Sequence, residues 1–309
     1  MATAVQEQKG AGTVRGGSFA RALLGFLWRV PVSAVVYTVA MSVGGVLAVV
    51  LGLTMPKLPV QMTSQQMAQL TFLSGLIVAV GLVPLAARQT GRFVTRWLAL
   101  ATLAYVSHGL NTAIEASVFT TMGGMAANAL VFVPPTVLIA AAVAWLFGSR
   151  QNAESLRARA AQFAASRRPA QWVWRVVLAI ASFPVAYFVF GMLLMAVRPG
   201  LMEYYRSGAV GLTVPGPDVV LWVATLRSCL FLAAALPVLI MWQGSRWGLA
   251  LALGLAMSAL VGLSGLVSVP WMPLEMRIGH GLEITADSFA HAAALVWLLV
   301  PPRQPGAAR

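Results

Sequence analysis

The chain has 309 residues, of which 59% are hydrophobic and only 9% are charged, and its mean hydropathy is +0.82. Soluble domains carry about 25% charged residues, so this composition excludes a soluble protein and predicts an all-α, polytopic integral membrane protein. The formal net charge of +13 is explained below by membrane topology, so we expect anionic lipid head groups as partners and no nucleic acid.

Hydropathy predicts eight transmembrane helices in chain order. They cover residues 30–53, 70–86, 97–119, 127–147, 172–197, 219–242, 247–268 and 281–300. Most are close to the ~20 residues that a helix needs to cross a bilayer. The polar, Gly- and Ala-rich residues 1–26 are expected to form a disordered cytoplasmic tail, and residues 304–309 a short C-terminal tail.

Basic residues predict the orientation of these helices. When the eight segments alternate across the membrane, sixteen Lys and Arg residues fall on one side and four fall on the other, namely Lys57, Arg198, Arg206 and Arg277. Basic loops stay in the cytoplasm, so both termini are expected to be cytoplasmic. We expect a multi-pass protein of the cell inner membrane or plasma membrane, with residues 151–171 as a basic amphipathic linker on the cytoplasmic surface.

Internal similarity predicts two four-helix repeats, residues 27–150 and 172–303. Trp28 and Arg29 align with Trp174 and Arg175, Pro84 with Pro237, Arg96 with Arg246, and Trp145 with Trp297. Each half has an even number of crossings, so the two repeats must be parallel and related by a pseudo-twofold axis along the membrane normal.

Small residues recur along one face of the seventh segment. Gly254, Ser258 and Gly262 are spaced four residues apart, which lets a neighbouring helix approach closely. We interpret this face first as a packing seam and secondly as a possible homodimer surface.

The eighth segment carries polar residues that lipid would penalise. His280, Glu283, Asp287 and His291 fall on a stripe about 80° wide at 100° per residue. A charged side chain at the centre of the bilayer costs ~2.5–3.5 kcal/mol on insertion scales. This edge is therefore expected to face protein or water.

The third segment has a similar polar edge. His108, Asn111, Thr112 and Glu115 share one face of it. At 1.5 Å per residue, Glu115 should lie in the outer half of the membrane and His108 near its middle. The two polar edges are therefore expected at comparable depths.

Arg227 in the sixth segment lies at a similar predicted depth. A guanidinium at that level requires a carboxylate, and we expect Asp287 as its partner with Glu115 close enough to share it. In the repeat alignment Arg227 corresponds to Ser74 and none of the three charges has a charged counterpart, so the predicted polar site is asymmetric.

These residues indicate a proton-linked secondary transporter or permease-like protein. Its pathway would be lined by Glu115, Arg227, Asp287, His291, His108, Asn111 and Glu283. The sequence contains no phosphate-binding loop, and we expect no cofactor and no metal site. Two alternatives stay open. One is an intramembrane enzyme acting on a lipid or quinone head group, and the other is a non-catalytic membrane subunit whose buried charges are structural.

Overall fold

The computed structural model describes residues 11–148, 155–208 and 211–302, and these residues form helices and no strands. Seven helices are long and apolar enough to cross a membrane. They are Leu23–Val50, Ser64–Arg88, Met125–Phe147, Pro169–Val197, Pro217–Met241, Arg246–Val267 and Leu274–Leu299. The prediction of an all-α chain is therefore confirmed, and the seven apolar helices are consistent with a multi-pass membrane protein.

The helices follow the chain in a simple order. Their bounds are α1 Ala11–Val50, α2 Ser64–Arg88, α3 Phe93–Ala104, α4 Asn111–Phe119, α5 Met125–Val131, α6 Val133–Phe147, α7 Leu156–Ala165, α8 Pro169–Val197, α9 Gly200–Arg206, α10 Pro217–Met241, α11 Arg246–Ser258, α12 Ser264–Val267 and α13 Leu274–Leu299. α1 begins at Ala11, so residues 11–26 are helical and the tail prediction does not hold for them, while residues 1–10 and 304–309 lie outside the described residues. α7 lies in the predicted linker, and Leu156 and Phe163 pack against the core.

Two π-helical turns interrupt the long helices. The turn η1 (Tyr105–Leu110) joins α3 to α4, and the turn η3 (Ala259–Leu263) joins α11 to α12. The segment 93–119 is therefore helical from end to end, but it is not among the seven candidate spans. Its polar residues His108, Asn111 and Glu115 lower its hydropathy.

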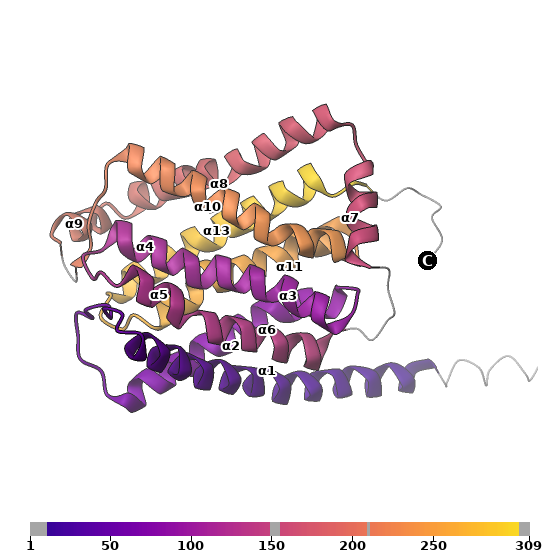
Figure 1. Ribbon diagram of the computed structural model, residues 1–309, viewed down its shortest axis with the longest axis horizontal. Helices are drawn as coiled ribbons and strands as arrows, with labels where there is room; N and C mark the ends of the chain where they lie inside the picture. Colours follow the sequence, from indigo (N-terminus) through magenta and orange to yellow (C-terminus); the bar gives the residue numbers. More distant parts are fainter. Residues whose placement is uncertain (1–10, 149–154, 209–210, 303–309) are drawn as a thin grey trace, which may run out of the picture.

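Several helix contacts in the first half of the chain have counterparts in the second (Figure 1). α1 contacts α2 and α6, and α8 contacts α10 and α13. α3 packs on α6, as α11 packs on α13. Between the halves, α2 contacts α11 while α10 contacts α3. The interface between the halves is thus built by the second and third long helices of each.

The loops after α2 and α10 meet at one end of the bundle. Gln89 and Trp242 form an isolated antiparallel bridge. The N–H of Thr90 donates to the carbonyl of Met241 at 3.1 Å, and the N–H of Gln243 donates to that of Arg88 at 2.8 Å. Gln89 and Trp242 lie 153 residues apart, the spacing that also separates Pro84 from Pro237.

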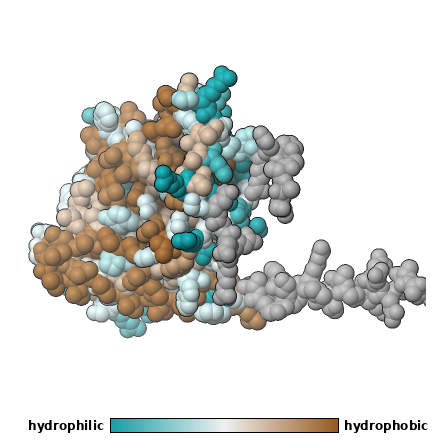
Figure 2. Space-filling model, turned by 45° about the vertical axis from the view of Figure 1, so that its right-hand side comes forward, coloured by the Kyte–Doolittle hydropathy of each residue, from teal (hydrophilic) through white to brown (hydrophobic). Residues whose placement is uncertain are grey.

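Arginines cap α13 at the same end of the bundle. Arg175 donates to the carbonyl of Leu298 at 2.7 Å, Arg246 donates to that of Trp297 at 2.7 Å, and Arg167 donates to that of Leu299. The last carbonyls of a helix lack partners inside it, and cations favour its C-terminus. Polar residues gather at this end in Figure 2, whereas the flank of the bundle is largely apolar.

The small-residue face of α11 and η3 is occupied within the chain. A Cβ at Gly254 would lie 2.6 Å from the ring of Phe289, and one at Gly262 would meet Ile284, both on α13. Ser258 is 1% exposed. The packing-seam prediction is therefore confirmed. The homodimer expected through Gly254, Ser258 and Gly262 stays a prediction, and it would have to displace α13, which covers this face.

Candidate functional site

An open cavity of about 1280 Å³ lies between the halves. Residues of α1, α2, α4, α5, α8, α9, α10, α12 and α13 line it, together with loop residues such as Met55, Met122, Thr213 and Trp271. These loops are at the end of the bundle near α9, opposite the arginine caps (Figure 1). The cavity therefore belongs to the arginine-poor end.

The cavity wall combines a few charges with flexible apolar side chains. Its charged residues are Arg227, Glu115, Glu283 and Asp287, and no lysine is among its lining residues. Nine of the 14 methionines in the chain line it: Met41, Met55, Met62, Met67, Met122, Met192, Met195, Met202 and Met272. Methionine is flexible and polarisable, so such a wall can adapt to irregular ligands.

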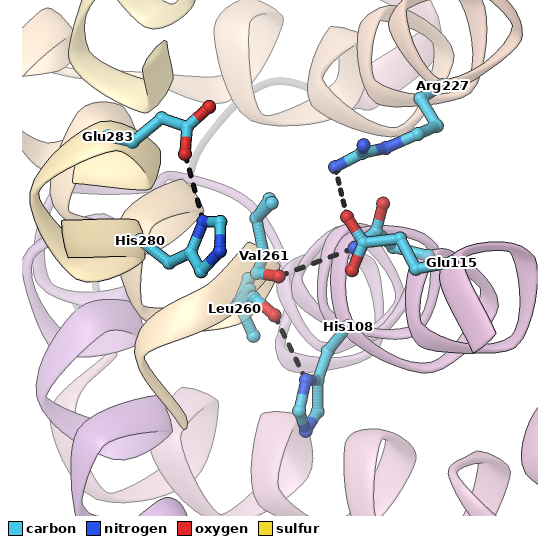
Figure 3. A network of polar contacts seen from close by, with 8 residues as sticks. His108, Glu115, Arg227, Leu260, Val261, His280 and Glu283 are labelled. Carbon is cyan, nitrogen blue, oxygen red and sulfur yellow. Dashed lines mark hydrogen bonds and ion pairs between the residues drawn. The ribbon is translucent and has the colours of Figure 1, made fainter. Parts of the chain in front are cut away.

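Arg227 pairs with Glu115 across the interface between the halves. Nη2 of Arg227 on α10 lies 2.8 Å from Oε1 of Glu115 on α4, and the two side chains are 4% and 37% exposed (Figure 3). The guanidinium also lies over the rings of Phe183, Tyr187 and Phe231, at 5.0, 5.8 and 5.7 Å from their centroids. Aromatic faces attract a cation and offset part of its desolvation cost.

Asp287 is not the direct partner of Arg227, so that prediction is wrong. Among the described residues no ion pair joins Arg227 and Asp287 within 4.0 Å. The carboxylate that pairs with Arg227 is that of Glu115. The reason is lateral position: Arg227 contacts α4 and the rings of α8, whereas Asp287 projects from α13. Asp287 is 3% exposed, lines the cavity, and its Oδ1 has no hydrogen-bond partner in the described structure.

His280 connects Glu283 to a tyrosine that sequence reasoning missed. Nδ1 of His280 lies 3.0 Å from Oε2 of Glu283, and the hydroxyl of Tyr205 on α9 lies 2.7 Å from Nε2. Burial raises the pKa of Tyr205, so its hydroxyl stays protonated and donates to Nε2. Nδ1–H of the imidazole then donates to Glu283. Tyr205 lies in a short helix outside the polar stripe, so helical periodicity gave no signal for it.

His108 and Asn111 have partners on η3. The hydroxyl of Tyr37 lies 2.7 Å from Nε2 of His108, and Nδ1 of His108 lies 3.0 Å from the carbonyl of Leu260. Nδ2 of Asn111 donates to the carbonyl of Val261 at 3.3 Å. Figure 3 shows the side chain of His108 turned toward the carbonyl of Leu260, away from Arg227. These contacts tie the two halves together at mid-helix.

His291 lies one turn below Asp287, outside the cavity lining. Its Nδ1 is 2.7 Å from the hydroxyl of Ser182, which itself donates to the carbonyl of Ala179 at 2.7 Å. Nδ1–H therefore donates to Ser182, leaving Nε2 as an acceptor. This Nε2 is buried without a partner among the described residues. Asp287 and His291 are thus two buried polar side chains, one turn apart on α13, and each has one atom without a hydrogen-bond partner among the described residues.

No protein family, curated protein or solved structure matches this chain. The described residues also contain no group of three or more His, Cys, Asp or Glu side chains placed to hold a metal ion. Functional inference therefore depends on the cavity itself.

The structure brings together five of the seven residues predicted for the pathway, since His108, Glu115, Arg227, Glu283 and Asp287 line the cavity. Asn111 and His291 are not among the residues that line it.

Proposed function

We propose that the chain is a proton-linked secondary transporter whose substrate site is the cavity at its arginine-poor end. The observation that carries this proposal is Asp287, a titratable group that is 3% exposed, lines the cavity and has an unpaired carboxylate oxygen. Ionisable residues inside membrane proteins mark ion and substrate pathways. Arg227 and Glu115 face the same cavity from α10 and α4, and Glu283 faces it from one turn above Asp287 on α13.

The proposed topology has eight spans with both termini in the cytoplasm. The segment 93–119 would supply the eighth span, because α3, η1 and α4 run without a break. Two features support this orientation. The described ends of α1 and α13 lie at the same end of the bundle (Figure 1), and the arginine-rich loops are at that end. The cavity would then open to the outer side.

The proposed four-helix repeat gains support from three structural features. The bridge between Gln89 and Trp242 joins positions that the alignment makes equivalent, and its two flanking hydrogen bonds exchange under the same relation. The π-helical turns η1 and η3 interrupt the third helix of each half. Several packing pairs also recur, since α1 with α2 and α6 corresponds to α8 with α10 and α13, and α3 with α6 corresponds to α11 with α13, whereas the contact of α2 with α6 has no counterpart of similar size. Duplicated transporters place their substrate sites between such halves.

The test is proton movement in proteoliposomes that contain a trapped pH-sensitive dye. Addition of a substrate should change the internal pH in vesicles with the native protein. Asp287→Asn should abolish this change, because an amide cannot carry the proton. Glu275→Gln is the matched control, since Glu275 lies on the exposed first turn of the same helix and outside the cavity lining. A native rate in the Asp287→Asn vesicles would refute the proposal.

A second candidate is an enzyme acting on a lipid or quinone head group. The hydrogen-bonded series Tyr205, His280 and Glu283 favours it, because an imidazole oriented by a carboxylate is a common acid–base arrangement. Incubation with membrane lipids, followed by mass spectrometry, would detect a product. Chemical change without proton flux would favour this candidate. A stable co-purifying partner with neither activity would favour a non-catalytic membrane subunit.

A further inference from the structure

The charge of the cavity wall is opposite to that of the chain. The chain has 21 basic and 8 acidic residues, whereas the cavity is lined by three carboxylates and one guanidinium. Glu115 neutralises Arg227 at 2.8 Å. Glu283 and Asp287 therefore remain as excess acidic groups on the α13 side, where the imidazole of His280 pairs with Glu283 at 3.0 Å.

The unpaired oxygen of Asp287 indicates what is missing. A buried carboxylate oxygen is costly to leave without a donor or a cation. The other buried charge in the cavity, Arg227, has a carboxylate at Nη2 and three aromatic faces around its guanidinium, although its Nε has no hydrogen-bond partner in the described structure. The wall thus already holds one organic cation, the guanidinium of its own arginine. The α13 side offers carboxylates without an equivalent cation.

The rest of the wall suits an apolar body around that cation. Nine methionines and the aromatic side chains of Phe183, Tyr187, Phe188 and Tyr205 face the cavity. Its volume of about 1280 Å³ exceeds the ~300–1000 Å³ of an ordinary small-molecule pocket. Adaptable thioether and aromatic walls accept ligands of varied shape.

We propose that the cavity binds lipophilic organic cations, with Asp287 as the principal counter-charge and Glu283 as the second. This inference rests on the proposed transport function for the direction in which the cation moves. Binding itself needs only the cavity, so the two proposals can fail separately.

The experiment compares two ions of nearly the same shape and opposite charge, tetraphenylphosphonium and tetraphenylborate. Binding to the purified full-length protein in detergent is measured by equilibrium dialysis, with protein-free micelles subtracted. Tetraphenylphosphonium should bind at least about tenfold more tightly than tetraphenylborate, because the acidic wall attracts one ion and repels the other. Equal or tighter binding of tetraphenylborate would overturn the proposal.

Variants locate the binding site. Asp287→Asn should weaken tetraphenylphosphonium binding by about tenfold, and Glu275→Gln should leave it unchanged. An unaltered affinity in a folded Asp287→Asn protein would overturn the proposal. If that variant does not fold, Glu283→Gln decides, since Glu283 is only partly buried. Loss of binding in Glu283→Gln supports the assignment, and retention of native affinity refutes it.

The outcomes separate this inference from the transport proposal. Tetraphenylphosphonium binding without proton flux in proteoliposomes would retain the cation site and remove the transporter. Proton flux driven by a neutral or anionic solute, with no tetraphenylphosphonium binding, would retain the transporter and remove the cation site.

Discussion

The ion pair between Arg227 and Glu115 gives an unequal prediction for its two partners. Glu115→Leu should destabilise the protein more than Arg227→Leu, although Glu115 is the more exposed side chain. The reason is the charge that each substitution leaves behind. Glu115→Leu strands a guanidinium that is 4% exposed, whereas Arg227→Leu strands a carboxylate that is 37% exposed in an open cavity.

The magnitudes follow from these exposures. A stranded buried charge costs about 3–5 kcal/mol. The three rings around Arg227 offset roughly 1–2 kcal/mol of that cost, so Glu115→Leu should cost about 2 kcal/mol. Water in the cavity can hydrate Glu115, so Arg227→Leu should cost only about 1 kcal/mol. The double variant should recover about 1 kcal/mol of the summed loss, within the range found for polar contacts between membrane helices.

Unfolding in mixed micelles by increasing dodecyl sulfate, followed by circular dichroism, measures these free energies. The control cycle pairs Arg227→Leu with Asp287→Leu, which should show a smaller coupling because those residues form no direct ion pair. A larger loss in Arg227→Leu than in Glu115→Leu would contradict the stranded-charge argument. Strictly additive losses for Arg227 and Glu115 would show that their contact contributes nothing to stability.

Two further predictions concern packing and topology. Gly44→Ala should cost about 2–3 kcal/mol of unfolding free energy, because its Cβ would overlap the backbone carbonyl of Val131 and lie 2.9 Å from the carbonyl carbon. The matched control is Gly45→Ala, whose added Cβ has no atom within 4 Å and which should be neutral or stabilising by up to about 1 kcal/mol. Equal losses of unfolding free energy in the two variants would show that the close contact at Gly44 does not limit stability. Reporter fusions after residues 60 and 122 should report the outer side, and those after residues 90 and 160 the cytoplasm. A cytoplasmic signal at 122 would remove the eighth span.

The sequence predicted the fold well where hydropathy carries the information. The predicted segments 172–197 and 219–242 match Pro169–Val197 and Pro217–Met241 closely, because a helix in lipid must be apolar over a fixed length. The π-helical turns were not predicted, because they change hydrogen-bond register without changing composition. The helical start of α1 was also missed, since its Gly- and Ala-rich sequence, interrupted by Arg15 and Arg21, lies outside the continuous apolar run.

The candidate site could be predicted by residue and depth but not by contact. Periodicity identified the polar edges of the third and eighth segments, and depth placed Arg227 beside them. Choosing between Asp287 and Glu115 required the lateral position of each helix, which depends on the packing of all of them. The aromatic contacts of Arg227 were not predicted either. They come from three rings on two helices, so they also depend on how the helices pack.

Under the proposed repeat, the ion pair has a counterpart that explains the asymmetry of the site. The 153-residue spacing that relates Gln89 to Trp242 also relates Ser74 to Arg227, and it places Glu115 opposite Ser268, three residues beyond the Gly265 that the 150-residue spacing of Arg96 and Arg246 indicates. The hydroxyls of Ser74 and Ser268 lie 2.6 Å apart, at the contact between α2 and the end of α12. The contact between corresponding helices is thus a neutral hydrogen bond between Ser74 and Ser268 in one position and an ion pair between Arg227 and Glu115 in the other. A duplicated frame needs only a short polar contact at each position, so the charge on Arg227 and Glu115 exceeds what packing requires. That excess favours a role for the pair in shaping the electrostatics of the cavity, because Arg227 is taken up by Glu115 and forms no ion pair with Asp287 among the described residues.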